Sequence, residues 1–259
     1  MYEETNLKLP NYLLTKDSSK ILKTNKVNPN QVTYMIYMLP ADKWQEYFSP
    51  EHIARLKIKQ KTLCPFADEA GCKVPCLNSA GHGAFDQTQM ARLKRTMLFL
   101  TDRERFFTML VGEILTLKAK LDKGKTLSLR LNGTSDIMWE NERVTIGGQT
   151  YPNIMAYFTD VQFYDYTKIT TRKIEHIPNY HLTWSYSEAK SKYADRMHKA
   201  FPKHNVAVVF RKEIPATFKG IRVISGDESD ARFLDPKHVI VGLLAKGKAK
   251  KDVSGFVIN

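Results

Sequence analysis

The chain has 259 residues, 42% of them hydrophobic, which is enough to bury one sizeable core without a second domain. It carries 40 lysine and arginine residues against 27 aspartate and glutamate residues, and its net charge of +13 favours an anionic partner, such as a nucleic acid or a phosphorylated metabolite. We expect neither a membrane protein nor an exported one, because no stretch approaches the ~18 apolar residues of a spanning helix and no cationic start precedes an apolar run.

The N-terminal part of the chain carries few signals of regular structure. Residues 1–30 are expected to form an irregular extension. A run of β-branched and aromatic residues at 32–38 predicts the first strand. Residues 40–85 are expected to form a long loop that contains all three cysteines.

Two helices are predicted after the cysteine loop, at residues 86–100 and 103–123. Thr101 or Asp102 suits the N-cap of the second helix, because a short side-chain oxygen can accept hydrogen bonds from the first amide groups. Gly124 suits the C-terminal end of this helix.

Further strands are predicted along the rest of the chain, at residues 127–131, 162–166, 181–186, 206–210, 221–224 and 239–244. Helices are expected at residues 154–158 and 187–201. Alternation of strands and helices is typical of a parallel sheet with crossover helices. We therefore predict a single α/β domain over residues 1–259.

Several of these strands are followed at once by polar or glycine-containing residues, at 132–136, 167–168, 187–188, 211–212 and 245–247. Ligands of parallel sheets and barrels bind at the carboxyl ends of the strands, so this edge is the predicted active face. Polar residues also end the strands of sheets that bind nothing there, which is the alternative interpretation.

Cys64, Cys72 and Cys76 have the spacing C-x7-C-x3-C in a segment rich in proline and glycine. An odd number of closely spaced cysteines in a cytoplasmic protein indicates metal binding or catalysis rather than a disulfide framework. Three thiolates suit a 4Fe-4S cluster with one open iron, whereas structural zinc takes four protein ligands. The alternatives are a zinc site completed by His82 and three unligated buried thiols.

The segment from Asn132 to Asp136 combines the flexible Gly133 with hydrogen-bonding side chains directly after an apolar strand. Such a loop can cradle a ligand. It can equally be an Asx turn, in which Asn132 or Asp136 only satisfies local backbone groups.

Alternation along residues 162–168 places Tyr164, Tyr166 and Lys168 on one face of a strand and Asp165 on the other. A buried acidic residue between aromatic residues needs a partner. We expect Lys168 or Arg130 to supply it.

Asp227, Glu228 and Asp230 follow another predicted strand, with Arg232 close behind. These carboxylates form either a cation site or a solvated turn. The chain has no phosphate-binding glycine loop, no G-x-S-x-G and no H-E-x-x-H motif, so the hydrolase classes that use them lack support.

Long and specific strings run through the chain: Cys64-Pro with Cys72 and Cys76-Leu-Asn, Ala80-Gly81, RLNGTSDIMWE, FYDYTK, NYHLTWSYSE, NVAVVF, SGDESDARFLDP and VGLLAKGKAKKDVSGFV. With these strings the chain resembles the phage-encoded gene product eighty-eight family. The resemblance implies a protein of the cytoplasm of a phage-infected bacterial host. It implies no reaction, because the family is largely uncharacterised.

The order of the elements also resembles that of the radical S-adenosylmethionine enzymes, in which a three-cysteine loop follows the first strand. Here the first strand, the cysteine loop, a helix and a strand ending in Asn132-Gly133-Thr134 come in the same order. The spacing departs from that superfamily's usual C-x3-C-x2-C. The resemblance implies a partial (β/α)6 barrel of mainly parallel strands, a 4Fe-4S cluster on the cysteines, and S-adenosylmethionine on its open iron.

Residue roles follow from this second resemblance. The expected cofactor contacts are Asn132, Gly133, Thr134, Ser135 and Asp136. The catalytic candidates, lining the rim around an anionic substrate, are Tyr164, Asp165, Lys168, Ser185, Glu188, Asp227, Asp230, Arg232 and Lys246.

A different class of function is a nucleic-acid-binding phage protein, stabilised by zinc or an iron–sulfur cluster and without catalysis. Its phosphate contacts would come from Lys246, Lys248, Lys250 and Lys251 and from the basic runs at residues 16–26 and 55–61. A third possibility is a protein that acts on a host partner. The sequence specifies neither the substrate nor the oligomeric state.

Overall fold

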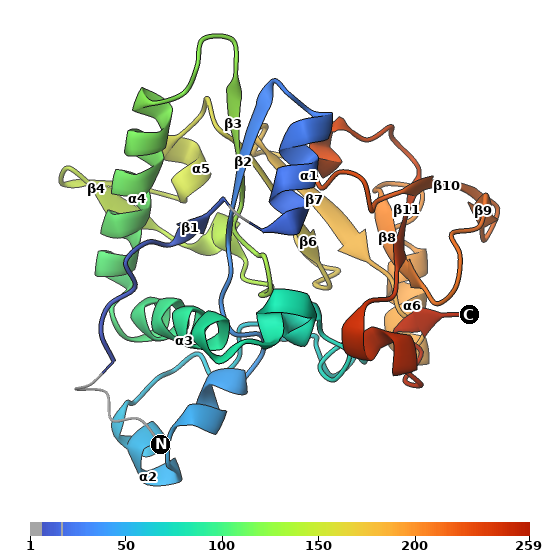
Figure 1. The fold of residues 1–259 in the computed structure, drawn as a ribbon, viewed down its shortest axis with the longest axis horizontal. Coiled ribbons are helices and arrows are strands. Elements are labelled where there is room, and N and C mark those ends of the chain that lie inside the picture. The colour runs from blue at the N-terminus through green and yellow to red at the C-terminus, as the bar shows by residue number, and fades with distance from the viewer. Residues whose placement is uncertain (1–6, 17) are drawn as a thin grey trace.

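The computed structural model describes residues 7–16 and 18–259, so expectations for the first six residues and for residue 17 lie outside the described residues. The described chain forms one α/β domain in which helices pack around a ten-stranded mixed sheet (Figure 1). The strands of the sheet are β1 (Leu14–Thr15), β2 (Gln31–Ile36), β3 (Thr126–Arg130), β6 (Gln162–Thr167), β7 (Tyr180–Ser185), β8 (Val206–Phe210), β9 (Thr217–Phe218), β10 (Ile221–Ser225), β11 (Ile240–Leu244) and β12 (Val257–Ile258). A separate hairpin pairs β4 (Val144–Ile146) with β5 (Gln149–Tyr151).

Most neighbouring strands of the sheet run parallel. Their order is β1-β2-β3-β6-β7-β8-β11-β10-β9, and β12 pairs with the last residues of β8. The pairs β1 with β2 and β9 with β10 are antiparallel. The predicted α/β class with mainly parallel strands is therefore confirmed, and the carboxyl ends of the parallel strands meet at one edge of the sheet.

The predicted strands are confirmed with small shifts at their ends. β8 has the predicted bounds, and β2 begins one residue before and ends two residues before the predicted ones. Side chains alternate between the two faces, so β3 directs Leu127 and Leu129 into the main core and Ser128 and Arg130 to the other face. The second face is polar near the carboxyl ends of the strands, so polar and charged side chains such as Arg130 lie there.

The two long predicted helices are confirmed as α3 (Asp86–Thr101) and α4 (Arg103–Ala119). Asp102 caps α4 by accepting a hydrogen bond from the amide of Arg105 at 3.0 Å. α4 ends before the predicted residue 123, because the chain after it makes a turn in which Gly124 has a φ of +83°. No helix of the described ranges is long and apolar enough to cross a membrane.

The later helices are shorter than predicted. α5 is Ile154–Tyr157, and α6 is Ser191–His198 instead of residues 187–201. Residues at the start of the predicted range are held elsewhere: the Ser187 hydroxyl donates to the carbonyl of Ala70 at 2.7 Å. Side-chain contacts with the cysteine loop thus replace the first helical turn.

The expectation of an irregular segment at residues 1–30 is wrong for its described part. It contains β1 and the helix α1 (Ser19–Val27), whose N-cap Ser18 accepts from the amide of Ile21 at 3.2 Å. α1 buries only Ile21 and Thr24, so its hydrophobic pattern is too weak to predict. The helix lies on the side of the sheet that faces the viewer in Figure 1.

The segment at residues 40–85 is also more regular than a single loop. It contains α2 (Pro50–Arg55) and several 3-10 helices, including η3 (Leu77–Ser79). A small core cluster anchors its first half to α3: Leu39, Trp44, Phe48, Leu93 and Met97. The indole of Trp44 donates to the carbonyl of Lys61 at 3.1 Å, which fixes the chain just before the first cysteine.

Candidate functional site at the carboxyl ends of the strands

The cysteine loop lies across the carboxyl ends of β2 and β3. The chain leaves β2 through Ala41, which has a left-handed φ of +50°. The amide of Leu63 donates to the carbonyl of Ala41 at 2.8 Å, and the amide of Asp136 donates to the carbonyl of Leu63 at 2.8 Å. Leu63 therefore ties the two strand ends together and places Cys64 beside both.

The thiol of Cys64 contacts backbone groups from both strand ends. It donates to the carbonyl of Thr134 at 3.9 Å and accepts a hydrogen bond from the backbone of Ala41. Burial raises the pKa of this thiol well above its ordinary value, and the charge of Asp136 raises it further. Because reactivity follows the thiolate, Cys64 without a cation is a poor nucleophile.

Cys72 and Cys76 lie in different surroundings. Burial raises the pKa of the Cys72 thiol, whereas the ammonium of Lys168 lowers it. Cys76 precedes η3 at its N-cap position. Burial lowers the pKa of the neighbouring Arg92 guanidinium, and the charge of Cys76 opposes this effect. Cys64 thus has a backbone donor close by, and Cys72 and Cys76 each interact with one cationic side chain.

The three thiols are free, but they are not gathered into a metal site. Within residues 7–16 and 18–259, no three His, Cys, Asp or Glu side chains are arranged to hold a metal ion. His82, the predicted fourth ligand of a zinc ion, is exposed and stacks on Phe85 with ring centroids 5.4 Å apart.

The loop after β3 uses its polar side chains to build its own turn. The side-chain oxygen of Asn132 accepts from the Ser135 hydroxyl and from the amide of Ile137, each at 2.9 Å. The Asn132 amide group donates back to the carbonyl of Ile137 at 2.9 Å. The Thr134 hydroxyl donates to the carbonyl of Met38 after β2. The geometry is that of the Asx-turn alternative, and ligand contacts from these residues stay a prediction.

Gly133 occupies a place in this loop where no side chain fits. A Cβ atom there would lie 2.5 Å from the carbonyl oxygen of Ile36 and 2.8 Å from the ring of Tyr37. The amide of Gly133 donates to that same carbonyl at 2.9 Å. Glycine therefore allows the loop to pack directly on the end of β2, next to the cysteine segment.

Two buried carboxylates, those of Asp165 and Asp136, connect this loop to β6 and β7. Asp165 accepts from the amide of Asn132 at 2.6 Å and from the hydroxyl of Tyr180 at 2.8 Å. Burial raises the pKa of Asp165 to about 7. Asp136 accepts from the hydroxyl of Thr167 at 2.8 Å and from the amide of Lys168 at 2.7 Å. The expectation that Lys168 or Arg130 pairs with Asp165 is wrong, because backbone and phenol donors already satisfy it.

Sequence reasoning missed the cation of this network. Arg172 has a fully buried side chain that forms two hydrogen bonds to Glu140, at 2.8 and 2.5 Å. It also donates to Tyr180 at 2.7 Å and lies 3.4 Å from Asp136. Its two carboxylate partners, Glu140 and Asp136, lie more than thirty residues away in the sequence, so no local spacing marks the ion pairs.

Lys168, Ser185 and Glu188 lie at the ends of β6 and β7. The Lys168 ammonium donates to the hydroxyl of Ser185 at 3.1 Å and lies 5.3 Å from the ring of Phe256. Glu188 accepts from the hydroxyl of Tyr186 at 2.8 Å. These three predicted residues are brought to the same edge as the cysteine loop.

The C-terminal tail also reaches this edge. The carbonyl of Gly255 accepts from the amide of Glu188 at 2.8 Å, and the hydroxyl of Ser254 donates to the carbonyl of Gly71 at 3.1 Å. A Cβ atom on Gly71 would lie 2.5 Å from Ala189. The tail therefore connects the cysteine loop to the end of β7, a contact between distant segments that sequence reasoning did not find.

Asp230 lies on the polar face of the sheet. It is completely buried, and its carboxylate contacts Arg130 and Lys20, each at 2.8 Å. The two cations keep its pKa far below the usual range against the opposing effect of burial. The hydroxyl of Tyr164 is buried nearby without a hydrogen-bond partner among the described residues. Asp230 is thus an ion-pair centre in this structure.

Asp227 and Arg232 have separate partners. Asp227 accepts from the Lys246 ammonium at 2.5 Å and from the amide of Leu244 at 3.0 Å. Arg232 is 2% exposed and lies 3.3 Å from the carboxylate of Asp235. Asp227 and Asp230 of the predicted cation site therefore bind side-chain cations of this chain.

Comparison with known proteins gives one family. A family model described as Gene product 88 matches residues 12–259. Neither the curated proteins nor the solved structures include a significant match to the chain.

Proposed function

The chain belongs to the gene product 88 family, and from the edge just described we propose that it is an iron–sulfur protein resembling the radical S-adenosylmethionine enzymes. Cys64, Cys72 and Cys76 would hold a 4Fe-4S cluster at the carboxyl ends of the parallel strands. Its place of action would be the cytoplasm of a phage-infected bacterium. Its substrate would be an anion, in keeping with the net charge of +13.

The position of the cysteine loop carries this proposal. The loop follows β2, the first of the parallel strands, and is hydrogen-bonded through Leu63 to the segment that follows β3. From β2 to β8 the parallel strands lie side by side in the order in which they occur in the chain. We propose that this part of the sheet is a partial (β/α) barrel with its ligand edge at the cysteines.

The chemistry of the thiols fits a cationic cluster. Burial raises the pKa of Cys64 and of Cys72, so both need a nearby cation to become thiolates. The charges of Asp136, Cys76 and Cys72 add to the effect of burial on the pKa of Cys64. A four-iron cluster is larger than one metal ion, so its ligands need not converge as closely as those of zinc.

The loop after β3 would contribute its backbone. The carbonyl of Thr134 accepts a hydrogen bond from the Cys64 thiol, with the sulfur and oxygen atoms 3.9 Å apart. With Cys64 bound to iron as a thiolate, this donor would be lost, and the carbonyl would be free to accept from another group. We propose that the Thr134 carbonyl would then accept a hydrogen bond from the ammonium group of S-adenosylmethionine. This cofactor and the cluster would together supply one-electron chemistry.

Residues of the neighbouring strand ends would bind the substrate. The charge of Lys168 lowers the pKa of Cys72, and its ammonium donates to the Ser185 hydroxyl. This ammonium would hold an anionic group of the substrate near the cluster. Glu188 lies next to the C-terminal tail, because its amide donates to the carbonyl of Gly255 at 2.8 Å. The remaining candidates would act by supporting this edge: Tyr164, Asp165, Asp227, Asp230, Arg232 and Lys246.

Metal and sulfide analysis of protein purified without oxygen, together with electron paramagnetic resonance, tests the proposal. We expect about four irons with sulfide per chain, and their loss when all three cysteines are changed to serine. His82→Ala is the matched control, because it removes the fourth ligand of the alternative zinc site and leaves the thiols in place. One zinc that is lost in His82→Ala, without iron, would overturn the proposal.

A further inference from the structure

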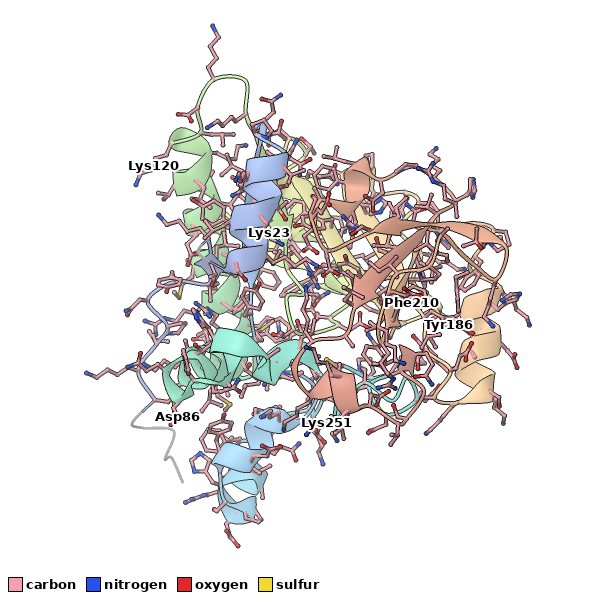
Figure 2. All side chains as sticks on the ribbon, turned by 45° about the vertical axis from the view of Figure 1, so that its right-hand side comes forward. Lys23, Asp86, Lys120, Tyr186, Phe210 and Lys251 are labelled. Atoms are coloured by element: carbon pink, nitrogen blue, oxygen red, sulfur yellow. The ribbon has the colours of Figure 1, made fainter. Side chains whose placement is uncertain are left out.

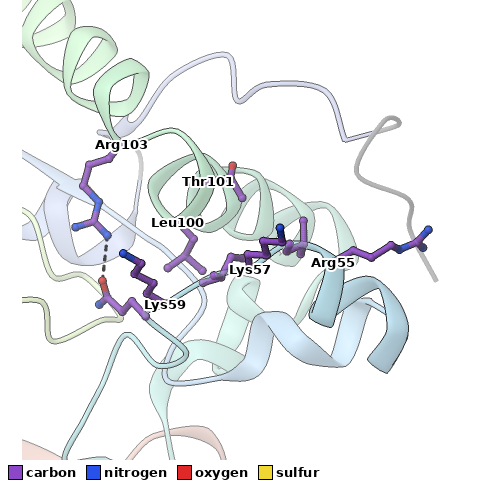
Figure 3. A pocket seen from close by; sticks show the side chains of 9 residues that line it. Arg55, Lys57, Lys59, Leu100, Thr101 and Arg103 are labelled. Atoms are coloured by element: carbon purple, nitrogen blue, oxygen red, sulfur yellow. Dashed lines mark hydrogen bonds between the residues drawn. The ribbon is translucent and has the colours of Figure 1, made fainter.

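A cleft of about 670 Å³ opens between the segment after α2 and the junction of α3 with α4 (Figure 3). Its lining residues are Arg55, Leu56, Lys57, Ile58, Lys59, Gln60, Leu100, Thr101 and Arg103. The proposed function uses none of them. The cleft therefore needs an explanation of its own.

The lining is cationic. Four of its side chains are basic and none is acidic. Lys57 and Lys59 are exposed and form no ion pair within the described part of the chain. Glu142 pairs with Arg103 at 2.5 Å but does not line the cleft. Exposed cations without a carboxylate partner, here Lys57 and Lys59, raise the local concentration of anions.

The backbone that carries these basic residues is anchored by the residues between them. Leu56 and Ile58 pack against the small core cluster, so the exposed Lys57 and Lys59 alternate with anchored side chains. Arg103 donates to Gln60 at 3.0 Å, the contact marked in Figure 3. A basic segment with a fixed backbone differs from a solvated, freely moving surface run.

A second basic segment contacts the cysteine loop. The 3-10 helix η7 (Gly247–Lys251) contacts η3 in the cysteine loop, and Gly247 packs near Ala80. Figure 2 shows Lys251 in the lower part of the view and Lys120 at its upper left. The two basic segments therefore flank the cysteine loop.

We propose that this cleft binds the phosphate backbone of a single nucleic-acid strand. Several cations along an open cleft suit a chain of phosphates better than one free phosphate ion. The apolar side chains of Leu56, Ile58 and Leu100 offer contacts for sugars and bases between the phosphates. The proposal does not rest on the metal centre, because its residues include no cysteine.

Fluorescence anisotropy with a labelled, mixed-sequence 15-nucleotide strand, as DNA and as RNA, tests the proposal over a range of salt concentrations. The test variant is Lys57→Gln with Lys59→Gln. The matched control is Lys120→Gln with Lys123→Gln, which removes the same charge from exposed lysines after α4, about 25 Å away along this helix. Circular dichroism checks that both variants are folded.

We expect both strands to bind, with affinity falling as salt rises. The cleft variant should weaken binding at low salt about tenfold, and should reduce the slope of log affinity against log salt by about 1.4. The control should keep the slope of the unaltered chain. Equal losses in the two variants would overturn the proposal, as would a mononucleotide or polyglutamate that competes as well as the strand.

Discussion

The guanidinium of Arg130 donates a hydrogen bond to the carboxylate of Asp230 at 2.8 Å, across 100 residues of sequence. Arg130 belongs to β3 and Asp230 to the turn after β10, so the pair connects the first strands of the parallel sheet to the last. Lys20 of α1 contacts the same carboxylate at 2.8 Å. One buried acidic residue thus holds a strand, a turn and a helix together.

Replacing Asp230 should strongly destabilise the fold. Asp230→Asn leaves two cations next to a completely buried side chain without a countercharge, and we expect a loss of about 3–5 kcal/mol in the free energy of unfolding. Urea denaturation followed by circular dichroism measures it. Asp160→Asn removes the exposed partner of Lys118 and should cost less than about 1 kcal/mol. Similar small losses in both variants would contradict the prediction.

The pH dependence of stability should carry the signature of Asp165. Burial raises its pKa in the folded chain to about 7, while an unfolded aspartate titrates near ~3.9. Between these values the folded state binds more protons than the unfolded state. The contribution of Asp165 to stability is therefore present at low pH and is lost as the pH rises from about 4 to 7.

Asp165→Asn should remove this part of the pH dependence. We expect the fall in unfolding free energy between pH 4.5 and pH 7.5 to be smaller in this variant than in the unaltered chain. Asp235→Asn is a useful comparison, because the pKa of Asp235 is raised only to about 6 and its effect should end at lower pH. An unchanged profile in Asp165→Asn would show that this carboxyl titrates normally.

Gly133→Ala should loosen the loop after β3 where it packs on the end of β2. The new Cβ would lie 2.5 Å from the Ile36 carbonyl oxygen, so the loop or the strand must move, at a cost of about 1–3 kcal/mol. Gly112→Ala is the control, because Gly112 lies within α4 with no atom near its Cβ position. That change should stabilise the chain by about 0.5–1 kcal/mol. Thermal denaturation of both variants distinguishes the opposite signs.

The strands could be predicted because their signal is local. β8 is a continuous apolar run from Val206 to Phe210, and the structure gives it those bounds. α1 was missed because it buries only Ile21 and Thr24, and its position depends on contacts with Asp230, more than two hundred residues later. A helix fixed by such distant partners leaves little periodicity in its own sequence.

The same contrast between local signals and distant contacts explains why the site was predicted only in part. The three cysteines stand out by spacing, whereas the partners of Asp165 depend on which loops meet. Tyr180 and Asn132 reach it from a strand and a turn on either side, and no spacing in the sequence pairs either of them with Asp165. The contact of the tail with the cysteine loop likewise depends on β12 pairing with β8.

The tail contact leads to a prediction about the reactivity of Cys72. The hydroxyl of Ser254 donates to the carbonyl of Gly71, the residue before Cys72, at 3.1 Å. Ser254→Ala removes this donor, so the buried thiol should become accessible more often and react several-fold faster with a thiol reagent. Val253→Ala is the adjacent control, since Val253 is 98% exposed and its change should leave the rate unaltered.

The measurement is the rate of labelling of Cys72 in metal-free protein whose other two cysteines are changed to serine. Under conditions that favour the fold, this rate reports the population of locally open states. If Ser254→Ala and Val253→Ala label at the same rate, the tail does not hold the cysteine loop. A faster rate in Ser254→Ala alone means that the C-terminal residues order the segment carrying the proposed cluster ligands, because the variant lacks only the hydroxyl that contacts the Gly71 carbonyl.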